Sequence, residues 1–297
     1  MNKKKEILFA IAFTFLCLVF LFLFTDKLTE SHPDFSKPWD HHKYIAMAKN
    51  PFELRIAPFC WRIFVPLMAW ILPFDVKVNF MLLAFTALWV TALIMYFLLR
   101  RGGFSFQLST GGMLLFLSLG WAVRYNVHDF WLVDPFAHLF LAATLLSLFA
   151  DKTILFAFLL VLGAATKESV LFVAPLYYTF KARRIFDLKC FFRFVAISLP
   201  AAIVLLLIRL WIKQGNGDIN YLAGLDSVFL NGFDEKPYTP ARLFSEVFLM
   251  RMNAIWRQPL DFLGMFTVET FGIFPLFLFL LGLGKHFADF AKYLPFV

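Results

Sequence analysis

The chain has 297 residues, of which 61% are hydrophobic, and its mean hydropathy is +0.74. An ordinary soluble domain could not bury that much apolar surface, so the composition indicates a polytopic membrane protein. The formal net charge is +8, but the basic residues gather at the ends of apolar runs. The positive-inside rule and anionic lipid headgroups explain that placement better than nucleic acid does. Three scattered cysteines (Cys17, Cys60 and Cys190) show no CxxC pattern and predict neither a disulfide nor a thiolate metal site.

The apolar runs are continuous rather than alternating, which predicts helices and not a barrel. We therefore expect an all-α protein, a single integral-membrane domain over 1–297, with about eight membrane helices. In chain order, the expected helices are 7–24, 79–99, 108–123, 130–149, 153–165, 169–180, 191–212 and 262–283. Lys3, Lys4 and Lys5 precede the first helix, which has no small-residue cleavage site after it. The prediction is a multi-pass protein of the plasma (inner) membrane with a cytoplasmic N-terminus.

Two of these helices are too short to span alone and are expected to form a hairpin with Lys167 and Glu168 at its tip. A spanning helix needs about 20 residues, and neither 153–165 nor 169–180 reaches that length. One long helix across the region would also place the basic KARR segment at 181–184 outside, against the positive-inside rule. Because ionisable groups at membrane depth are costly, the tip is predicted to lie at the bottom of a water-filled pocket.

The polar stretches divide into external and cytoplasmic loops. The first external loop is 25–77 and includes an interfacial helix at 58–73; the second is 213–260, with another interfacial helix at 242–257. The expected topology leaves four acidic residues on the cytoplasmic side, namely Glu6, Asp151, Asp187 and Asp289. Chemistry on the outer face would explain this skew, and so would the long external loops.

The first candidate group for chemistry lies in the first external loop. Asp40 precedes Tyr44 by four residues, which places both on one face of a helix. Asp40 is suited to act as a general base at a half-dry interface, or it is a solvated loop carboxylate. His41 and His42 beside it could bind a metal or substrate, or be plain loop residues.

The second group is a tight external turn, RYNVHDFWLVDP, that leads into the helix at 130–149. His128, Asp129, Asp134 and His138 could supply oxygen and nitrogen ligands to a divalent metal ion, although their spacing matches no known signature. The alternative for Asp129 or Asp134 is helix N-capping.

The third and fourth candidate groups consist of charged residues, and their cations could bind phosphate. Lys167 and Glu168 form either part of a site or a buried structural ion pair. The external arginines either form bidentate contacts with phosphate or anchor the chain at the membrane interface. They are Arg55, Arg62, Arg251 and Arg257.

Three segments together resemble the C-type integral-membrane glycosyltransferases, which use polyprenyl-phosphate sugars. WDHHKY is similar to an early D-x-x-x-Y motif of that family, and RIAPFCWRIFVPLMAWILP to the arginine- and proline-rich segment that follows it. GAATKESVLFVAPLYY resembles the hairpin small-x-x-[RK]-E-[ST]-apolar-P of bacterial members. The chain departs from the family in its modest length, in having no obvious soluble C-terminal domain, and in having Lys167 where arginine is frequent.

The resemblance implies transfer of a sugar from a polyprenyl-phosphate donor, at the outer face of the membrane, to a glycan, lipid or protein acceptor. Asp40 would be the base, and Lys167 with Arg55, Arg62 or Arg251 would bind the donor phosphate. Glu168 would orient Lys167. Asp134 or Asp129, with Tyr44 and His128 nearby, would bind the acceptor or a divalent metal ion. The partners would be the donor, the acceptor and the lipid bilayer.

Two other classes of function remain open from the sequence. A transporter or flippase would also use intramembrane charges, typically within inverted repeats, and no repeat is evident. A non-catalytic membrane scaffold would need Lys167 and Glu168 for stability only. HExxH, GxSxG and Walker patterns are missing, so nucleotide-dependent and common hydrolytic chemistry has no visible motif.

Overall fold

A computed structural model of the chain describes residues 3–37, 39–182, 184 and 186–213, and these residues form helices connected by turns and loops. The expected helix at 262–283, the interfacial helix at 242–257, the rest of the second external loop and Arg251 lie outside the described residues. The α-helices are α1 Lys3–Phe24, α2 Asp40–Lys49, α3 Phe64–Ile71, α4 Val76–Arg101, α5 Phe106–Leu117, α6 Tyr125–His128, α7 Asp134–Phe149, α8 Thr153–Thr166, α9 Ala174–Lys181 and α10 Leu188–Trp211. Shorter helical turns are η1 Pro33–Ser36, η2 Phe59–Trp61, η3 Gly120–Arg124 and η4 Glu168–Val173.

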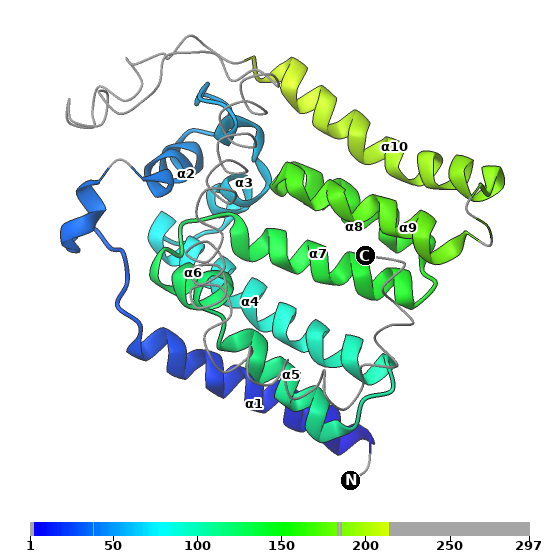
Figure 1. The fold of residues 1–297 in the computed structure, drawn as a ribbon. Helices are drawn as coiled ribbons and strands as arrows, with labels where there is room; N and C mark the ends of the chain where they lie inside the picture. Colours follow the sequence, from blue (N-terminus) through cyan, green and yellow to red (C-terminus); the bar gives the residue numbers. More distant parts are fainter. Residues whose placement is uncertain (1–2, 38, 183, 185, 214–297) are drawn as a thin grey trace, which may run out of the picture.

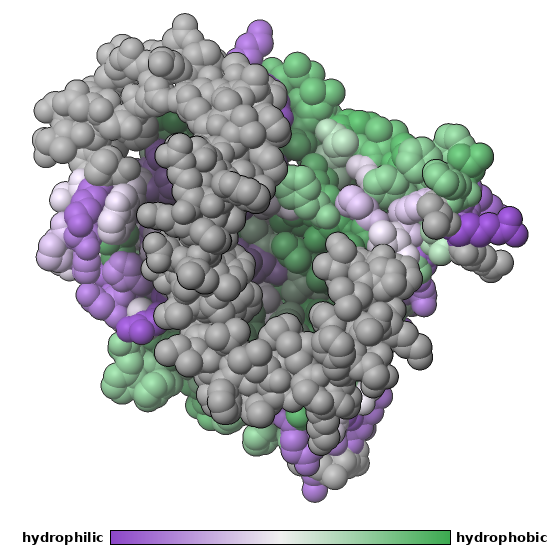
Figure 2. Space-filling model, in the orientation of Figure 1, coloured by the Kyte–Doolittle hydropathy of each residue, from purple (hydrophilic) through white to green (hydrophobic). Residues whose placement is uncertain are grey.

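The long helices lie roughly side by side, so the described part of the molecule has two ends (Figure 1). At one, here called the Glu6 end, Arg100 pairs with Glu6 at 3.2 Å and the Arg101 Nε donates to the Phe149 carbonyl at 2.6 Å. The opposite end, here called the α2 end, holds α2, α3, α6 and the turn at Lys167 (Figure 1). Hydrophilic residues gather toward these ends, with hydrophobic residues between them (Figure 2).

Three helices of the described chain, α1, α4 and α10, are long and apolar enough to cross a membrane. Counting the bent pair α5 and Gly120–His128 as one span gives four. The helices α7 and α8 are apolar but have only 16 and 14 residues. A membrane protein is therefore supported, while the expected count of about eight spans is not confirmed.

The prediction of one helix at 108–123 is wrong. The chain instead breaks after α5, and the following segment, a π-helical turn continued by α6, is bent by 64°. Leu119 adopts an extended backbone immediately before Gly120, so the α-helical hydrogen-bond ladder stops there. Asn126 stabilises the new direction by donating to the carbonyls of Trp121 and Ala122 at 2.9 and 3.1 Å. The break turns this segment across the α2 end.

The chain reverses at Lys167, where the sequence predicts the tip of a hairpin. Lys167 has an extended backbone between α8 and η4, and α9 then runs back until Lys181 pairs with Asp151 near the start of α8. Gly163 permits the close approach of the two arms, because a Cβ there would lie 2.4 Å from Val170 Cγ1. Lys181 therefore lies at the Glu6 end, together with Arg100 and Arg101.

The expected interfacial helix at 58–73 is shorter than predicted. Only η2 and the eight residues of α3 are helical there, and Arg62 lies between them with a non-helical backbone. Asn79 of α4 holds the end of α3 in place by donating to the carbonyls of Ala69, Leu72 and Phe74. Because Arg62 lies outside the helix, its guanidinium reaches Glu168 in the turn at Lys167.

Candidate functional site

A cavity of about 730 Å³ lies at the α2 end and brings together residues that are far apart in the sequence. It is lined by Trp39, Asp40, Trp121, Ala122, Tyr125, Asn126, Leu132, Asp134, His138 and Lys167. Asp40 enters from the first loop, Asp134 from the start of α7 and Lys167 from the tip of the hairpin. These three charged residues, each proposed from the sequence for chemistry, share one cavity.

Asp40 is the first residue of α2, and its side chain is half exposed. Lys43, one turn later, donates to the Asp40 Oδ1 at 2.9 Å. The ammonium of Lys43 also lies 3.9 Å from the centre of the Phe59 ring, so its position is held by a cation–π contact as well. The carboxylate at the cavity is thus oriented by a lysine that is itself fixed.

Lys167 donates to the Asp134 Oδ1 at 2.5 Å, and both side chains remain about a quarter exposed. Asp134 is the first residue of α7, and no side chain caps that helix, so the alternative of N-capping by Asp134 does not hold. The partial exposure keeps the ammonium within reach of a ligand in the cavity. Asp134 thus orients the ammonium of Lys167, which can bind an anion in the cavity.

Glu168 does not orient Lys167, contrary to the expectation from the sequence. Its carboxylate accepts two hydrogen bonds from the Nη2 and Nε of Arg62, at 2.8 and 3.2 Å, and the Nη1 of Arg62 donates to the Tyr44 hydroxyl at 3.2 Å. Adjacent residues at an extended position point in different directions, which is why Lys167 and Glu168 have separate partners. In place of an ion pair between the two, Lys167 pairs with Asp134 of α7 and Glu168 pairs with Arg62 of the loop before α3.

Arg62 is correspondingly not available as a phosphate-binding fork. Its guanidinium is engaged by Glu168 and Tyr44, and its side chain is 13% exposed. Among the described residues that line the cavity there is neither Arg62 nor Arg55. The network of Arg62, Glu168 and Tyr44 instead joins α2, the loop before α3 and the hairpin tip.

Asp129, at the end of α6, and His41, on α2, form a buried pair. Both side chains are nearly inaccessible, and the Oδ2 of Asp129 lies 3.9 Å from the Nδ1 of His41. Those atoms have no hydrogen-bond partner among the described residues. Burial raises the pKa of Asp129 to about 7 and lowers the pKa of His41 to about 4. Asp129 closes α6 rather than capping the N-terminus of a helix with its side chain.

The expected metal ligands do not converge. No group of three or more His, Cys, Asp or Glu side chains in the described chain is arranged to hold a metal ion. His128 lies away from the other expected ligands, with its Nδ1 on the Asp26 carbonyl at 2.8 Å and its ring near that of His32. Only Asp134 and His138 of the predicted four reach the cavity.

Sequence reasoning missed the aromatic wall of the cavity, formed by Trp39, Trp121 and Tyr125. The ring centres of Trp121 and Tyr125 lie 4.7 Å apart. Tryptophan and tyrosine in a membrane protein are normally assigned to interfacial belts. The available signal was Gly120 immediately before Trp121, because a glycine inside a long apolar helix is a candidate break point.

Comparisons of the chain with protein families, with curated proteins and with solved structures found no match.

Proposed function

We propose that the protein is a membrane glycosyltransferase that moves a sugar from a polyprenyl-phosphate donor to an acceptor hydroxyl at the α2 end. The observation that supports this most is the shared cavity of Asp40, Asp134 and Lys167. A carboxylate able to remove a proton and a cation able to hold a phosphate are the two groups that the reaction requires. The aromatic wall adds large, rigid apolar surface against which a sugar ring can lie.

The proposed chemistry is a single displacement. The acceptor oxygen attacks the anomeric carbon of the donor sugar, and the bond between that carbon and the phosphate oxygen breaks. Asp40 takes the proton of the acceptor hydroxyl, and the polyprenyl phosphate leaves with the bonding electron pair. A phosphate leaves without being protonated, so one carboxylate is sufficient where a glycosidase needs two.

Lys167 stabilises the charge that develops on the departing phosphate, and Asp134 holds its ammonium in place. This assigns to Asp134 the orienting role that the sequence assigned to Glu168. Glu168, Arg62 and Tyr44 position the hairpin tip from behind. The pairing of Lys167 with a partly exposed carboxylate is compatible with this role, because a phosphate can share the ammonium's remaining donors.

The test uses purified protein and a panel of polyprenyl-phosphate sugars. A donor that binds the folded protein should raise its melting temperature, and the transfer assay should then follow release of polyprenyl phosphate. We expect Asp40→Asn to keep the donor-induced stabilisation and to lower the transfer rate by about 10²- to 10⁴-fold, the usual contribution of a general base.

Asp26→Asn is the matched control, because Asp26 is an exposed carboxylate of the same loop, outside the cavity. Unchanged transfer by Asp40→Asn would refute the assignment of the base. Translocation of a lipid-linked substrate across a vesicle membrane, with no chemical conversion of any donor, would support a transporter instead.

A further inference from the structure

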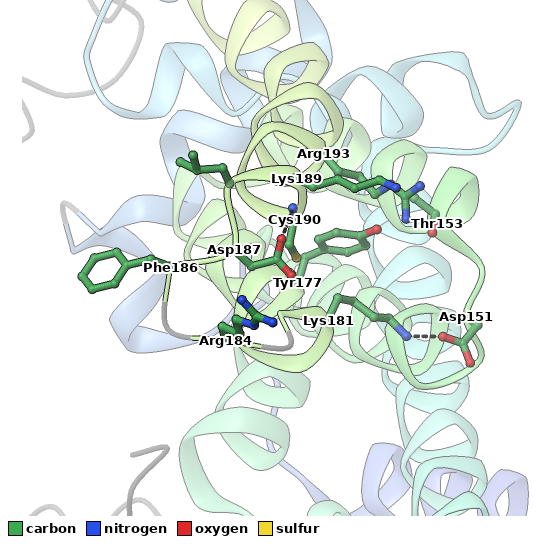
Figure 3. A pocket seen from close by; sticks show the side chains of 11 residues that line it. Asp151, Thr153, Tyr177, Lys181, Arg184, Phe186, Asp187, Lys189, Cys190 and Arg193 are labelled. Atoms are coloured by element: carbon green, nitrogen blue, oxygen red, sulfur yellow. Dashed lines mark hydrogen bonds and ion pairs between the residues drawn. The ribbon is translucent and has the colours of Figure 1, made fainter.

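A second cavity, of about 700 Å³, lies at the Glu6 end and has no part in the proposed transfer reaction. It is formed by the start of α8, the end of α9 and the first two turns of α10, as Figure 3 shows. Four cationic side chains line it, namely Lys181, Arg184, Lys189 and Arg193. Lys181 and Arg184 belong to the KARR segment, which the charge pattern predicts to be cytoplasmic, and Lys189 and Arg193 lie on α10.

Two carboxylates also line this cavity, but each has a structural partner. Asp151 pairs with Lys181, and Asp187 accepts a hydrogen bond from the backbone N–H of Cys190 at 2.9 Å, which caps α10 (Figure 3). No carboxylate of the described residues forms an ion pair with Lys189 or Arg193, which extend from successive turns of α10. The cavity therefore has an excess of positive charge, and its most suitable ligand is an anion.

Apolar surface borders the same cationic group. Phe186 and Leu188 line the cavity and are 89% and 70% exposed. Phe192 continues this apolar surface along α10, a candidate span of which only 11% is buried against the rest of the molecule. A small soluble anion would leave these groups without a contact. A ligand with a phosphate headgroup and hydrocarbon chains would satisfy both the cations and the apolar border.

We propose that this cavity is a binding site for the headgroup of an anionic phospholipid. The phosphodiester would lie between Lys189, Arg193 and Arg184, and the acyl chains would lie along the exposed side of α10. Basic pockets between membrane helices recognise anionic headgroups in this way, and each cation near the surface strengthens the attraction. The site would tie the hairpin, through α9, to α10 and to one leaflet of the membrane.

The experiment measures lipid binding to the full chain in detergent by native mass spectrometry, with phosphatidylglycerol as the anionic probe and phosphatidylcholine as the zwitterionic one. We expect clear preference for phosphatidylglycerol and a weakening of roughly 5-fold for each cation removed, hence roughly 25-fold for Lys189→Gln with Arg193→Gln. Lys3→Gln with Lys5→Gln removes the same charge from the same end outside the cavity. This control should change the affinity less than about twofold.

The exchange Lys189→Arg with Arg193→Lys keeps both charges and should retain binding, which separates loss of the site from loss of the fold. Three results would overturn the proposal: equal affinity for the two lipids, an equal loss in the Lys3 and Lys5 control, or displacement of phosphatidylglycerol by millimolar inorganic phosphate. The last result would mean that the cavity recognises a free phosphate rather than a lipid.

Discussion

The two ends of the molecule contain cavities of similar volume, but their charged side chains differ in burial and pairing. At the α2 end, several charged side chains are paired across distant segments and are buried, as with Asp129 at 1% and Arg62 at 13% exposure. At the Glu6 end, Asp151 is 73% exposed, and the cations of α10 extend from the surface.

Desolvating charges is costly unless each has a partner and a fixed geometry, so the α2 end must hold its groups rigidly. That rigidity is what a reaction centre requires. The exposed charges of the Glu6 end can instead adapt to a headgroup at the membrane surface. Three predictions test this difference, beginning with the largest expected effect.

Lys167→Gln should lower the rate of sugar transfer by about 10²- to 10³-fold, the range seen when one donor to a developing oxyanion is removed. The physical reason is the loss of the cation that would face the departing phosphate in the proposed reaction. Lys167→Arg should recover most of the rate, because the charge and the contact with Asp134 can be retained. The measurement is single-turnover transfer with a saturating donor.

Lys77→Gln is the matched control for this variant, since Lys77 pairs with Glu30 at 3.2 Å on the exposed surface outside the cavity. It should retain the full transfer rate. If Lys167→Gln transferred sugar as fast as the Lys77 control, the two ends would not differ in chemical role.

The pair of Arg62 and Glu168 should contribute to stability, unlike the pair of Lys181 and Asp151. Breaking a fully buried pair costs about 3–5 kcal/mol, and the 33% exposure of Glu168 reduces our expectation to about 2 kcal/mol for Glu168→Gln. Thermal unfolding in detergent should show a lower melting temperature for Glu168→Gln and none of that loss for Asp151→Asn.

A double-mutant cycle of Glu168→Gln with Arg62→Met isolates the interaction between the two side chains. The double variant should be more stable than the sum of the single losses predicts, because it leaves no unpaired buried charge. Strictly additive losses would show that the bidentate geometry carries no coupling energy.

Much of this arrangement could be predicted from the sequence, and what failed has a common physical origin. Apolar runs and flanking charges sufficed for α1, α4 and α10, and helix length together with the KARR segment sufficed for the turn at Lys167. The partners of Lys167 and Glu168 could not be predicted, because neighbours in the chain diverge at an extended residue and their contacts depend on tertiary packing.

The break before Gly120 was missed for a related reason. Hydropathy reports the environment of a segment but not its direction, and a bent pair of short helices has the same apolar run as one straight helix. Trp121 and Tyr125 consequently entered the candidate site only through the structure. The expected eight membrane helices are not confirmed, partly because α7 is shorter than a full span and partly because 262–283 lies outside the described residues.

The last prediction concerns the buried pair of Asp129 and His41, which should make stability at the α2 end depend on pH. The pKa of Asp129 is raised to about 7 in the folded protein from an ordinary value of 3.8, so the folded state binds more protons between these values. Its contribution to the free energy of unfolding is therefore present at low pH and is lost as the pH rises to 7. Asp129→Asn should raise the melting temperature relative to the parent protein at pH 8 but not at pH 4.

His41 acts in the opposite direction, because its folded pKa of about 4 lies below the ordinary value of 6.5. The unfolded chain then binds more protons between these values, and stability falls as the pH decreases from 6.5 through 4. His41→Gln should remove that loss, so the melting temperature of the variant should rise relative to that of the parent protein as the pH is lowered. Melting curves from pH 4 to 8 measure both variants, and Asp151→Asn is the exposed-carboxylate control. Parallel pH profiles for the parent protein and both variants would mean that Asp129 and His41 titrate normally, and that the α2 end is no drier than the Glu6 end.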